Sequence, residues 1–287
     1  MFRSKLSLCL ATGALTIGSF LTVVSCNKKD KNTNPTTTTE DNGYASEHAV
    51  SEKSFDDAQT IADQASNVVS GNLGYKTTAL TTGGCATVTH SATGDTTTVD
   101  FGTVNCLCHD GRNRRGKIII TKTGPYTATG SVKTITFNNY YQNDNQVTGT
   151  KTITNMGLNS SGQPYFNVTV SGSVILASGA GTVTTNWTRV RTWTAGSATT
   201  TDYTDDVYSI SGTGTITRPS GAVVNVNIST ATPLVVAFGC RWIEAGTIVY
   251  TLPSGLTRTI NYGTTPVCDA TATLTTPAGA TYTITMP

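Results

Sequence analysis

The chain has 287 residues, of which 13% are charged, and its formal net charge is only +2. So small a basic excess argues against a nucleic-acid-binding protein. The 37% of hydrophobic residues argues against a chain that is mostly disordered.

The N-terminus has the pattern of an export signal. Arg3 and Lys5 form a positive head, residues 6–24 are apolar or small, and Val24-Ser25 precede Cys26. This pattern predicts a signal peptide over residues 1–25. The cysteine preceded by Val-Ser resembles a bacterial lipobox, which implies diacylation of the Cys26 thiol and insertion of its acyl chains into the outer membrane. Ordinary secretion with an incidental cysteine is the alternative, and the periplasmic or cell-surface side stays undecided.

The rest of the chain is expected to form one domain behind a tether. Residues 26–45 are polar and threonine-rich, which predicts a disordered tether. Apolar residues then recur at helical spacing and predict one amphipathic helix at about 51–70, beginning near Ser54 and ending near Gly71. Residues 46–287 are taken as a single β-rich domain that includes this helix.

From residue 75 onward, threonine, glycine and β-branched residues dominate, and turns recur every 10 to 15 residues. We therefore expect an all-β fold: a long antiparallel meander folded into a curved sheet, half-barrel or sandwich. Side-chain matching predicts that 131–141 pairs with 146–155, with Ile135 opposite Ile153. It also predicts that 204–217 pairs with 222–228, with Ile216 opposite Val224.

Five cysteines follow Cys26, and four of them bound two similar segments. Gly84-Cys85 leads through a β-rich passage to Cys106, and Gly239-Cys240 leads through a similar passage to Cys268. In an oxidising compartment this repetition predicts the disulfides Cys85–Cys106 and Cys240–Cys268. Cys108 is left over, or it replaces Cys106 as the partner of Cys85.

A resemblance covers most of the chain past residue 80. It is carried by Asp100-Phe-Gly, Asp110-Gly-Arg-Asn-Arg-Arg-Gly-Lys, Gly149-Thr-Lys-Thr-Ile-Thr-Asn155 and Arg191-Thr-Trp-Thr-Ala-Gly196. These segments resemble an uncharacterised family of Bacteroidota outer-membrane lipoproteins. The resemblance implies a β-rich, exported, membrane-anchored protein, and it implies no reaction or ligand.

Two groups of side chains near residue 110 invite a functional interpretation. Cys106, Cys108 and His109 carry zinc-ligand atoms, but their spacing does not fit a zinc knuckle, so no metal or cofactor is predicted. Four cations crowd one segment and could hold a phosphate or an acidic sugar, or simply form a charged turn: Arg112, Arg114, Arg115 and Lys117.

The strand predicted over 182–194 is the most informative segment. Its odd positions share one face and include Trp187, Arg189, Arg191 and Trp193, with Asp206 and Tyr208 expected on the neighbouring strand. Alternating rings and charges suit a sugar-binding surface. The alternative is an internal cross-strand ladder with an Arg189–Asp206 ion pair, and it is favoured because both partners lie within one hairpin.

Three functions are compatible with these patterns. The first is a non-catalytic, lipid-anchored envelope protein with a structural role or a role in binding a glycan or another envelope protein. The second is an envelope glycan hydrolase that uses aspartates near the Trp187–Trp193 face, although acids and histidines are scarce. The third is a periplasmic carrier of a hydrophobic ligand, which requires a concave cavity.

Overall fold

The computed structural model describes residues 39–67, 83–199, 204–240 and 242–286, and the side chains from Ser46 onward. All of these residues belong to one compact unit, Thr37–Pro287. The signal peptide, Cys26, Val68 and Val69 lie outside the described residues. Among the residues described, no helix has the length and apolar character needed to cross a membrane.

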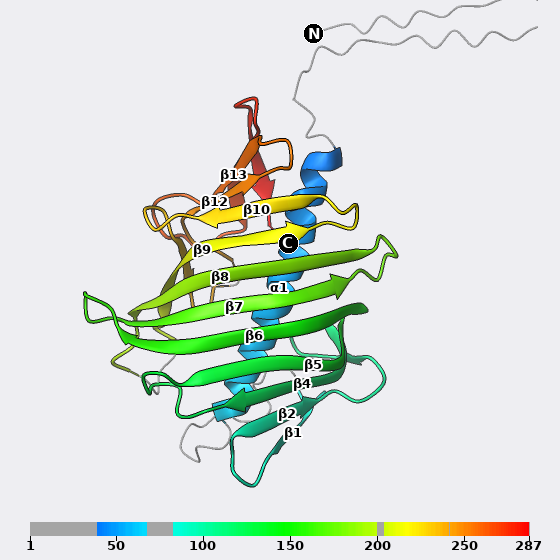
Figure 1. Cartoon of the computed structure of the whole chain (residues 1–287), viewed down its shortest axis with the longest axis vertical. Helices are drawn as coiled ribbons and strands as arrows, with labels where there is room; N and C mark the ends of the chain where they lie inside the picture. Colours follow the sequence, from blue (N-terminus) through cyan, green and yellow to red (C-terminus); the bar gives the residue numbers. More distant parts are fainter. Residues whose placement is uncertain (1–38, 68–82, 200–203, 241, 287) are drawn as a thin grey trace, which may run out of the picture. The chain divides into compact units, whose positions relative to one another are not determined.

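The described residues of this unit form one helix and fifteen strands (Figure 1). The first elements are α1 (Thr39–Asn67), β1 (Thr87–His90), β2 (Thr96–Asp100), β3 (Cys106–Leu107), β4 (Asn113–Lys122), β5 (Val132–Gln142), β6 (Asn145–Leu158) and β7 (Pro164–Ile175). The remaining strands are β8 (Thr182–Ala195), β9 (Val207–Thr217), β10 (Val223–Ile228), β11 (Leu234–Ala237), β12 (Thr247–Thr251), β13 (Thr257–Asn261), β14 (Thr271–Thr275) and β15 (Thr281–Thr285).

The strands form one antiparallel sheet that does not close into a barrel. Successive strands pair in the order β1-β2-β4-β5-β6-β7-β8-β9-β10-β12-β13-β14-β15, while β3 pairs with β4 and β11 pairs with β9. β9 therefore has two partners on one side, with β11 along its first half and β10 along its second half. The predicted antiparallel meander is confirmed.

The predicted registers had mixed outcomes. Ile216 lies opposite Val224, as expected. The other predicted hairpin also forms, between β5 and β6, but its register was wrong, because Ile135 pairs with Lys151 rather than Ile153. A two-residue turn at Asn143 and Asp144, both with positive φ, fixes the end of this hairpin, and an irregularity between Thr136 and Tyr141 then shifts the pairing further.

The helix is present but longer than predicted, because α1 begins at Thr39, within the segment assigned to the tether. The expected helix start at Ser54 was wrong. Ser54 lies inside the helix, and its hydroxyl donates to the carbonyl of Val50, one turn earlier. The apolar stripe is confirmed, since Ala58, Ile61, Ala62 and Ala65 are all buried, and Phe55 belongs to the same buried face.

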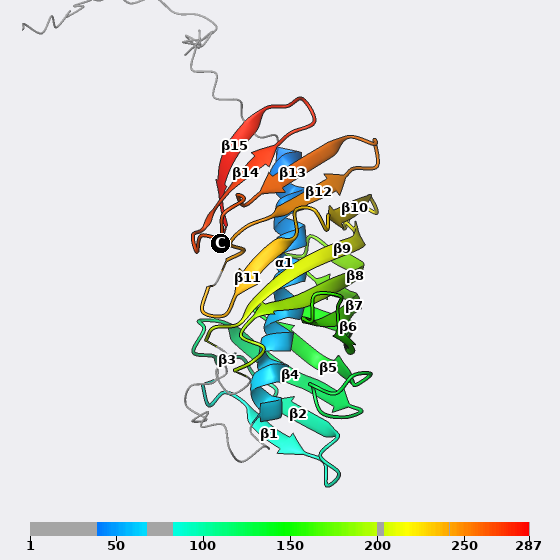
Figure 2. The ribbon, with the colours of Figure 1, turned by 90° about the vertical axis from the view of Figure 1, so that its left-hand side faces the viewer.

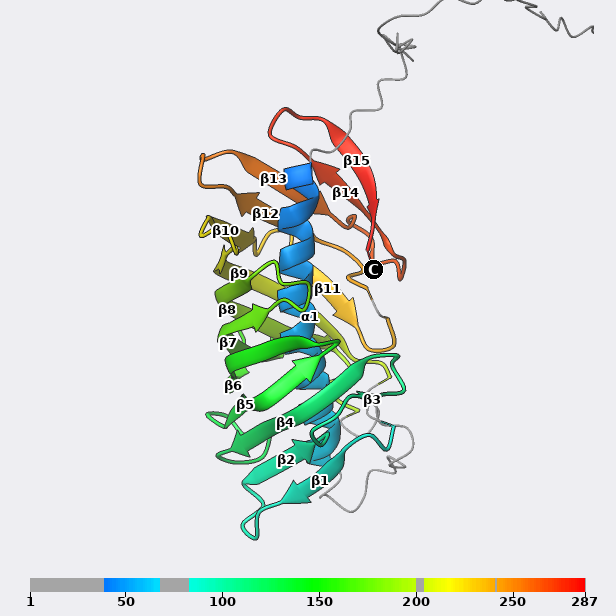
Figure 3. The ribbon, with the colours of Figure 1, turned by 90° about the vertical axis from the view of Figure 1, so that its right-hand side faces the viewer.

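α1 lies on one face of the sheet and crosses its strands (Figures 2 and 3). The helix approaches most closely where β7 carries a glycine. A Cβ on Gly172 would lie 2.4 Å from the ring of Phe55 and 2.5 Å from the carbonyl oxygen of Thr148. The missing side chain therefore makes room for the Phe55 ring, which joins the core beneath the helix. A second core fills the part of the sheet formed by β9 to β14.

Candidate functional site

β8 presents an inward row of alternating side chains beneath the helix. Trp187, Arg189 and Trp193 are buried, as are Val183 and Thr185. The predicted shared face is therefore confirmed. The neighbouring strand β9 accommodates the large groups with glycines, since Gly214 lies opposite Trp187 and Gly212 lies opposite Arg189.

Arg189 binds a carboxylate on the helix, so the expected Arg189–Asp206 pair was wrong. Both oxygens of Glu52 accept hydrogen bonds from the guanidinium, with Nη2 to Oε1 at 2.6 Å. His48 extends this contact, because its Nε2 lies 3.2 Å from Glu52 and its Nδ1 lies 2.7 Å from Tyr250 Oη. Burial alone would raise the pKa of Glu52, but the charges and hydrogen bonds of Arg189 and His48 outweigh it and hold this pKa far below its usual range.

Other acids of α1 bind further strands in the same way. Asp56 lies 2.7 Å from the buried Lys151 of β6, and Asp63 lies 2.5 Å from Lys133 of β5. Glu47 accepts two hydrogen bonds from Arg218, which follows β9. A series of ion pairs therefore holds the helix across the sheet in addition to its apolar stripe.

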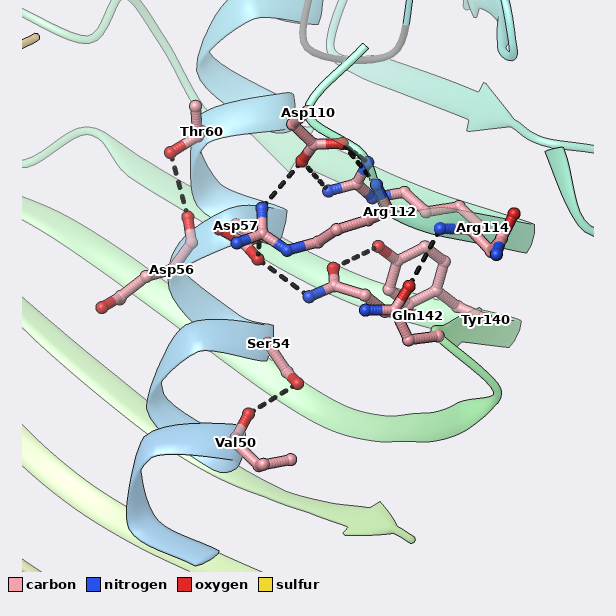
Figure 4. Close-up of polar contacts among 12 residues, drawn as sticks. Val50, Ser54, Asp56, Asp57, Thr60, Asp110, Arg112, Arg114, Tyr140 and Gln142 are labelled. Carbon is pink, nitrogen blue, oxygen red and sulfur yellow. Dashed lines mark hydrogen bonds and ion pairs between the residues drawn. The ribbon is translucent and has the colours of Figure 1, made fainter. Parts of the chain in front are cut away.

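A denser polar network joins α1 to the start of β4 (Figure 4). Arg112 lies 3.1 Å from Asp57 and 2.7 Å from Asp110. The fully buried Arg114 donates both terminal nitrogens to the same Asp110 carboxylate. Burial raises the pKa of Asp57 despite Arg112. At Asp110 the two arginines outweigh the effect of burial and lower the pKa.

The suggested anion-binding loop is not supported by this arrangement. Arg115 binds Asp144, and Lys117 lies 2.8 Å from Asp100. Together with Arg112 and Arg114, all four cations therefore have carboxylate partners within the protein. The segment is a self-neutralised charged turn and strand, which was the alternative interpretation.

The cysteines form the two expected bridges, Cys85–Cys106 and Cys240–Cys268. Cys108 is a free, buried thiol. In the described part of the chain, one cluster with metal-ligand atoms occurs, at Cys240, Glu244 and Cys268. Two of its three members are the sulfurs of a disulfide, so the cluster does not offer a thiolate site for zinc.

A cleft of about 1160 Å³ opens between α1 and the strands from β5 to β13. Of the six side chains that the sequence predicted to face one another on β8 and β9, five line this cleft: Arg189, Arg191, Trp193, Asp206 and Tyr208. Trp187 is not among the residues that line this cleft, and the cations of Arg189 and Lys151 lie over its ring, 4.3 and 5.4 Å from the ring centre.

One wall of the cleft is apolar, and strand register explains why. Ile210 of β9 lies opposite Leu234 of β11, and Tyr208 lies opposite Val236. Residues two apart on a strand share a face, so these four side chains form one patch. All four line the cleft, and Phe238 and Tyr262 extend the patch.

Trp193, Tyr208 and Asp206 form a rigid group at one end of this wall. The Trp193 and Tyr208 rings are stacked at 5.7 Å, and Asp206 accepts hydrogen bonds from Trp193 Nε1 and Tyr208 Oη. Burial raises the pKa of Asp206 in spite of these donors. The neighbouring Asp205 is exposed and accepts a hydrogen bond from Thr199 instead. The two aspartates therefore have separate environments, and the arrangement does not resemble the facing carboxylates of a glycosidase.

Arg191 is the one member of the predicted face whose charge is not matched by an adjacent acid. Its guanidinium lies over the Tyr208 ring, 3.6 Å from the ring centre. No hydrogen bond or ion pair joins it to another side chain among the described residues. Burial would lower the pKa of Arg191, but the nearby Tyr126, Tyr208 and Asp63 raise it.

The chain matches no family model, no curated protein and no solved structure. The site therefore has to be interpreted from its own geometry. Sequence reasoning found the β8 face but missed the acids of α1 that complete it. The available signal was the recurrence of acids every four to seven residues along the predicted helix and just before it: Glu47, Glu52, Asp56 and Asp63.

Proposed function

We propose that the protein is a lipid-anchored envelope protein that binds and carries a hydrophobic ligand in the cleft between α1 and strands β8, β9 and β11. The observation that supports this proposal is the apolar wall, where Ile210, Leu234 and Val236 line a cleft of about 1160 Å³. Small-molecule sites typically occupy about 300–1,000 Å³ and have mostly apolar walls.

The other functions have less support. A glycan hydrolase needs two facing carboxylates, whereas Asp205 and Asp206 make separate contacts. A purely structural role would not require partly exposed aliphatic side chains such as Ile210 and Val236 inside a cleft. Their exposure costs stability unless a ligand covers them.

The proposed anchor suits this function. Acyl chains on Cys26 would hold the domain at the outer membrane, close to a source of hydrophobic molecules. Two acyl chains give stable membrane attachment, whereas one chain gives only marginal attachment.

The test is labelling with a neutral photoprobe in isolated membranes that contain the full chain. A fatty alcohol carrying a diazirine and an alkyne is added, irradiated and located by peptide mapping. We expect labelled peptides from β9 and β11, because Ile210, Leu234 and Val236 face the cleft. Labelling confined to other segments would contradict the proposal.

A pair of variants sharpens this test. Val236→Trp places a bulky ring against the apolar wall and should reduce labelling of β9. Val190→Trp places the same ring on the opposite face of β8, where Val190 is exposed, and should leave labelling unchanged. Equal labelling of both variants would show that the probe does not enter the cleft.

A further inference from the structure

Arg191 differs from other arginines of the domain in what its guanidinium contacts. Arg112, Arg114, Arg115, Arg189 and Arg218 each lie within ion-pair distance of a carboxylate. Arg191 instead lies over the Tyr208 ring and lines the cleft. The aromatic face attracts the cation, and among the described residues no acceptor takes a hydrogen bond from its five donors.

The nearest acids are committed elsewhere. Asp206 accepts hydrogen bonds from Trp193 and Tyr208. Asp63 pairs with Lys133. Partial burial of a guanidinium without a hydrogen-bonded acid costs stability, and a ligand oxyanion would supply the missing acceptor.

Register places this cation beside the apolar wall. Arg191 of β8 lies opposite Ile210 of β9, which in turn lies opposite Leu234 of β11. The three side chains therefore form one row across neighbouring strands, about 4.8 Å apart from strand to strand. The Arg191 cation and the apolar side chains of Ile210 and Leu234 therefore lie side by side in the cleft.

We infer that the ligand is an amphiphile with an oxyanion head, which Arg191 binds, and a single apolar tail, which lies along Ile210 and Leu234. This inference rests on the proposed function and adds the chemical class of the ligand to it. A planar guanidinium binds carboxylate and phosphate oxygens with two parallel hydrogen bonds, so both heads share this chemistry. A fatty acid and a lysophospholipid-type phosphate monoester are the two sources.

The experiment measures competition against the neutral photoprobe on the full chain. Oleate, oleoyl lysophosphatidate and oleyl alcohol have the same tail and differ in the head. We expect the better oxyanion to compete at a concentration about 10- to 100-fold below that of the alcohol, the effect of a hydrogen-bonded charge pair. The ranking of oleate against lysophosphatidate identifies the head. Equal competition by all three would overturn the inference while leaving the proposed carrier intact.

Variants of Arg191 separate recognition of the head from a structural role. Arg191→Gln should remove the preference for oxyanions and leave competition by the alcohol unchanged, while Arg191→Lys should keep part of the preference. Arg115→Gln is the matched control, because Arg115 also lies over a tyrosine ring, at 3.8 Å, but binds Asp144 instead of lining the cleft.

Three results would count against the inference. If Arg191→Gln weakened all three competitors equally, Arg191 would only support the apolar wall. If Arg115→Gln lost the preference as well, the effect would be one of net charge. If the photoprobe failed to label the cleft of the unaltered protein, the proposed function itself would fall, and this inference with it.

Discussion

The buried pair between Glu52 and Arg189 is expected to be a principal attachment of α1 to the sheet. The side chains of both residues are largely buried, at 15% and 8% exposed. Replacing Glu52 by Leu puts an apolar side chain of similar size in its place and leaves Arg189 without its carboxylate. Removing one partner of a buried pair costs about 3–5 kcal/mol, because the remaining charge stays desolvated and unpaired.

The companion variants test that reasoning. Replacing both members, as Glu52→Leu with Arg189→Met, should recover most of the loss, since a buried ion pair and an apolar pair of similar volume are often equally stable. The exposed pair between Lys117 and Asp100 is the control. Lys117→Met should cost at most about 1 kcal/mol, because the two side chains are 45% and 35% exposed.

Urea unfolding followed by tryptophan fluorescence measures these differences, and pH adds a second criterion. The pKa of Glu52 is lowered in the folded protein, so its contribution is fully present above the unfolded pKa of about 4.3 and is lost as pH falls below that value. The gap between the original protein and Glu52→Leu should therefore shrink below about pH 4. A double variant no more stable than Glu52→Leu, or a gap independent of pH in acid, would refute the assignment.

Three further predictions concern separate parts of the chain. Trp193→Ala should lower the free energy of unfolding by about 3–5 kcal/mol, since the ring is buried against Tyr208, and a melting curve that barely shifts would instead favour an exposed glycan-stacking role. Gly172→Ala should cost about 1–3 kcal/mol in the same assay because its Cβ meets Phe55, whereas Gly124→Ala, with its nearest neighbour at 3.9 Å, should stay within about 0.5 kcal/mol. Cys26→Ser should move the protein from the membrane fraction to the soluble envelope fraction, and a mutant that still sediments with membranes would contradict lipid anchoring.

The sequence was most informative where the signal is local. Period-two alternation placed Trp187, Arg189 and Trp193 on one face without knowledge of the sheet, because successive side chains of a strand point to opposite faces. The two similar cysteine segments indicated both disulfides for the same reason, since each bridge closes a short stretch of chain.

The partners of that face could not be predicted, because they depend on where a distant helix lies. Glu52 and Arg189 are 137 residues apart, and nothing in a strand pattern shows which helix turn crosses it. The nearer Asp206 was therefore the plausible but wrong partner. The hairpin register failed for a separate, local reason. The turn at Asn143 and Asp144 and the irregularity between Thr136 and Tyr141 each displace the pairing.

The connectivity of the sheet has a consequence for how the domain assembles. Most strands pair with a strand next to them in sequence, so the meander can grow by adding hairpins in chain order. The helix comes first in the chain, yet Glu47 binds Arg218, 171 residues later, and His48 contacts Tyr250, 202 residues later. Contacts of such separation form slowly because a long loop must close first. We therefore expect a collapsed sheet with an undocked helix to precede the native state, and the cleft to take its final form only when α1 docks.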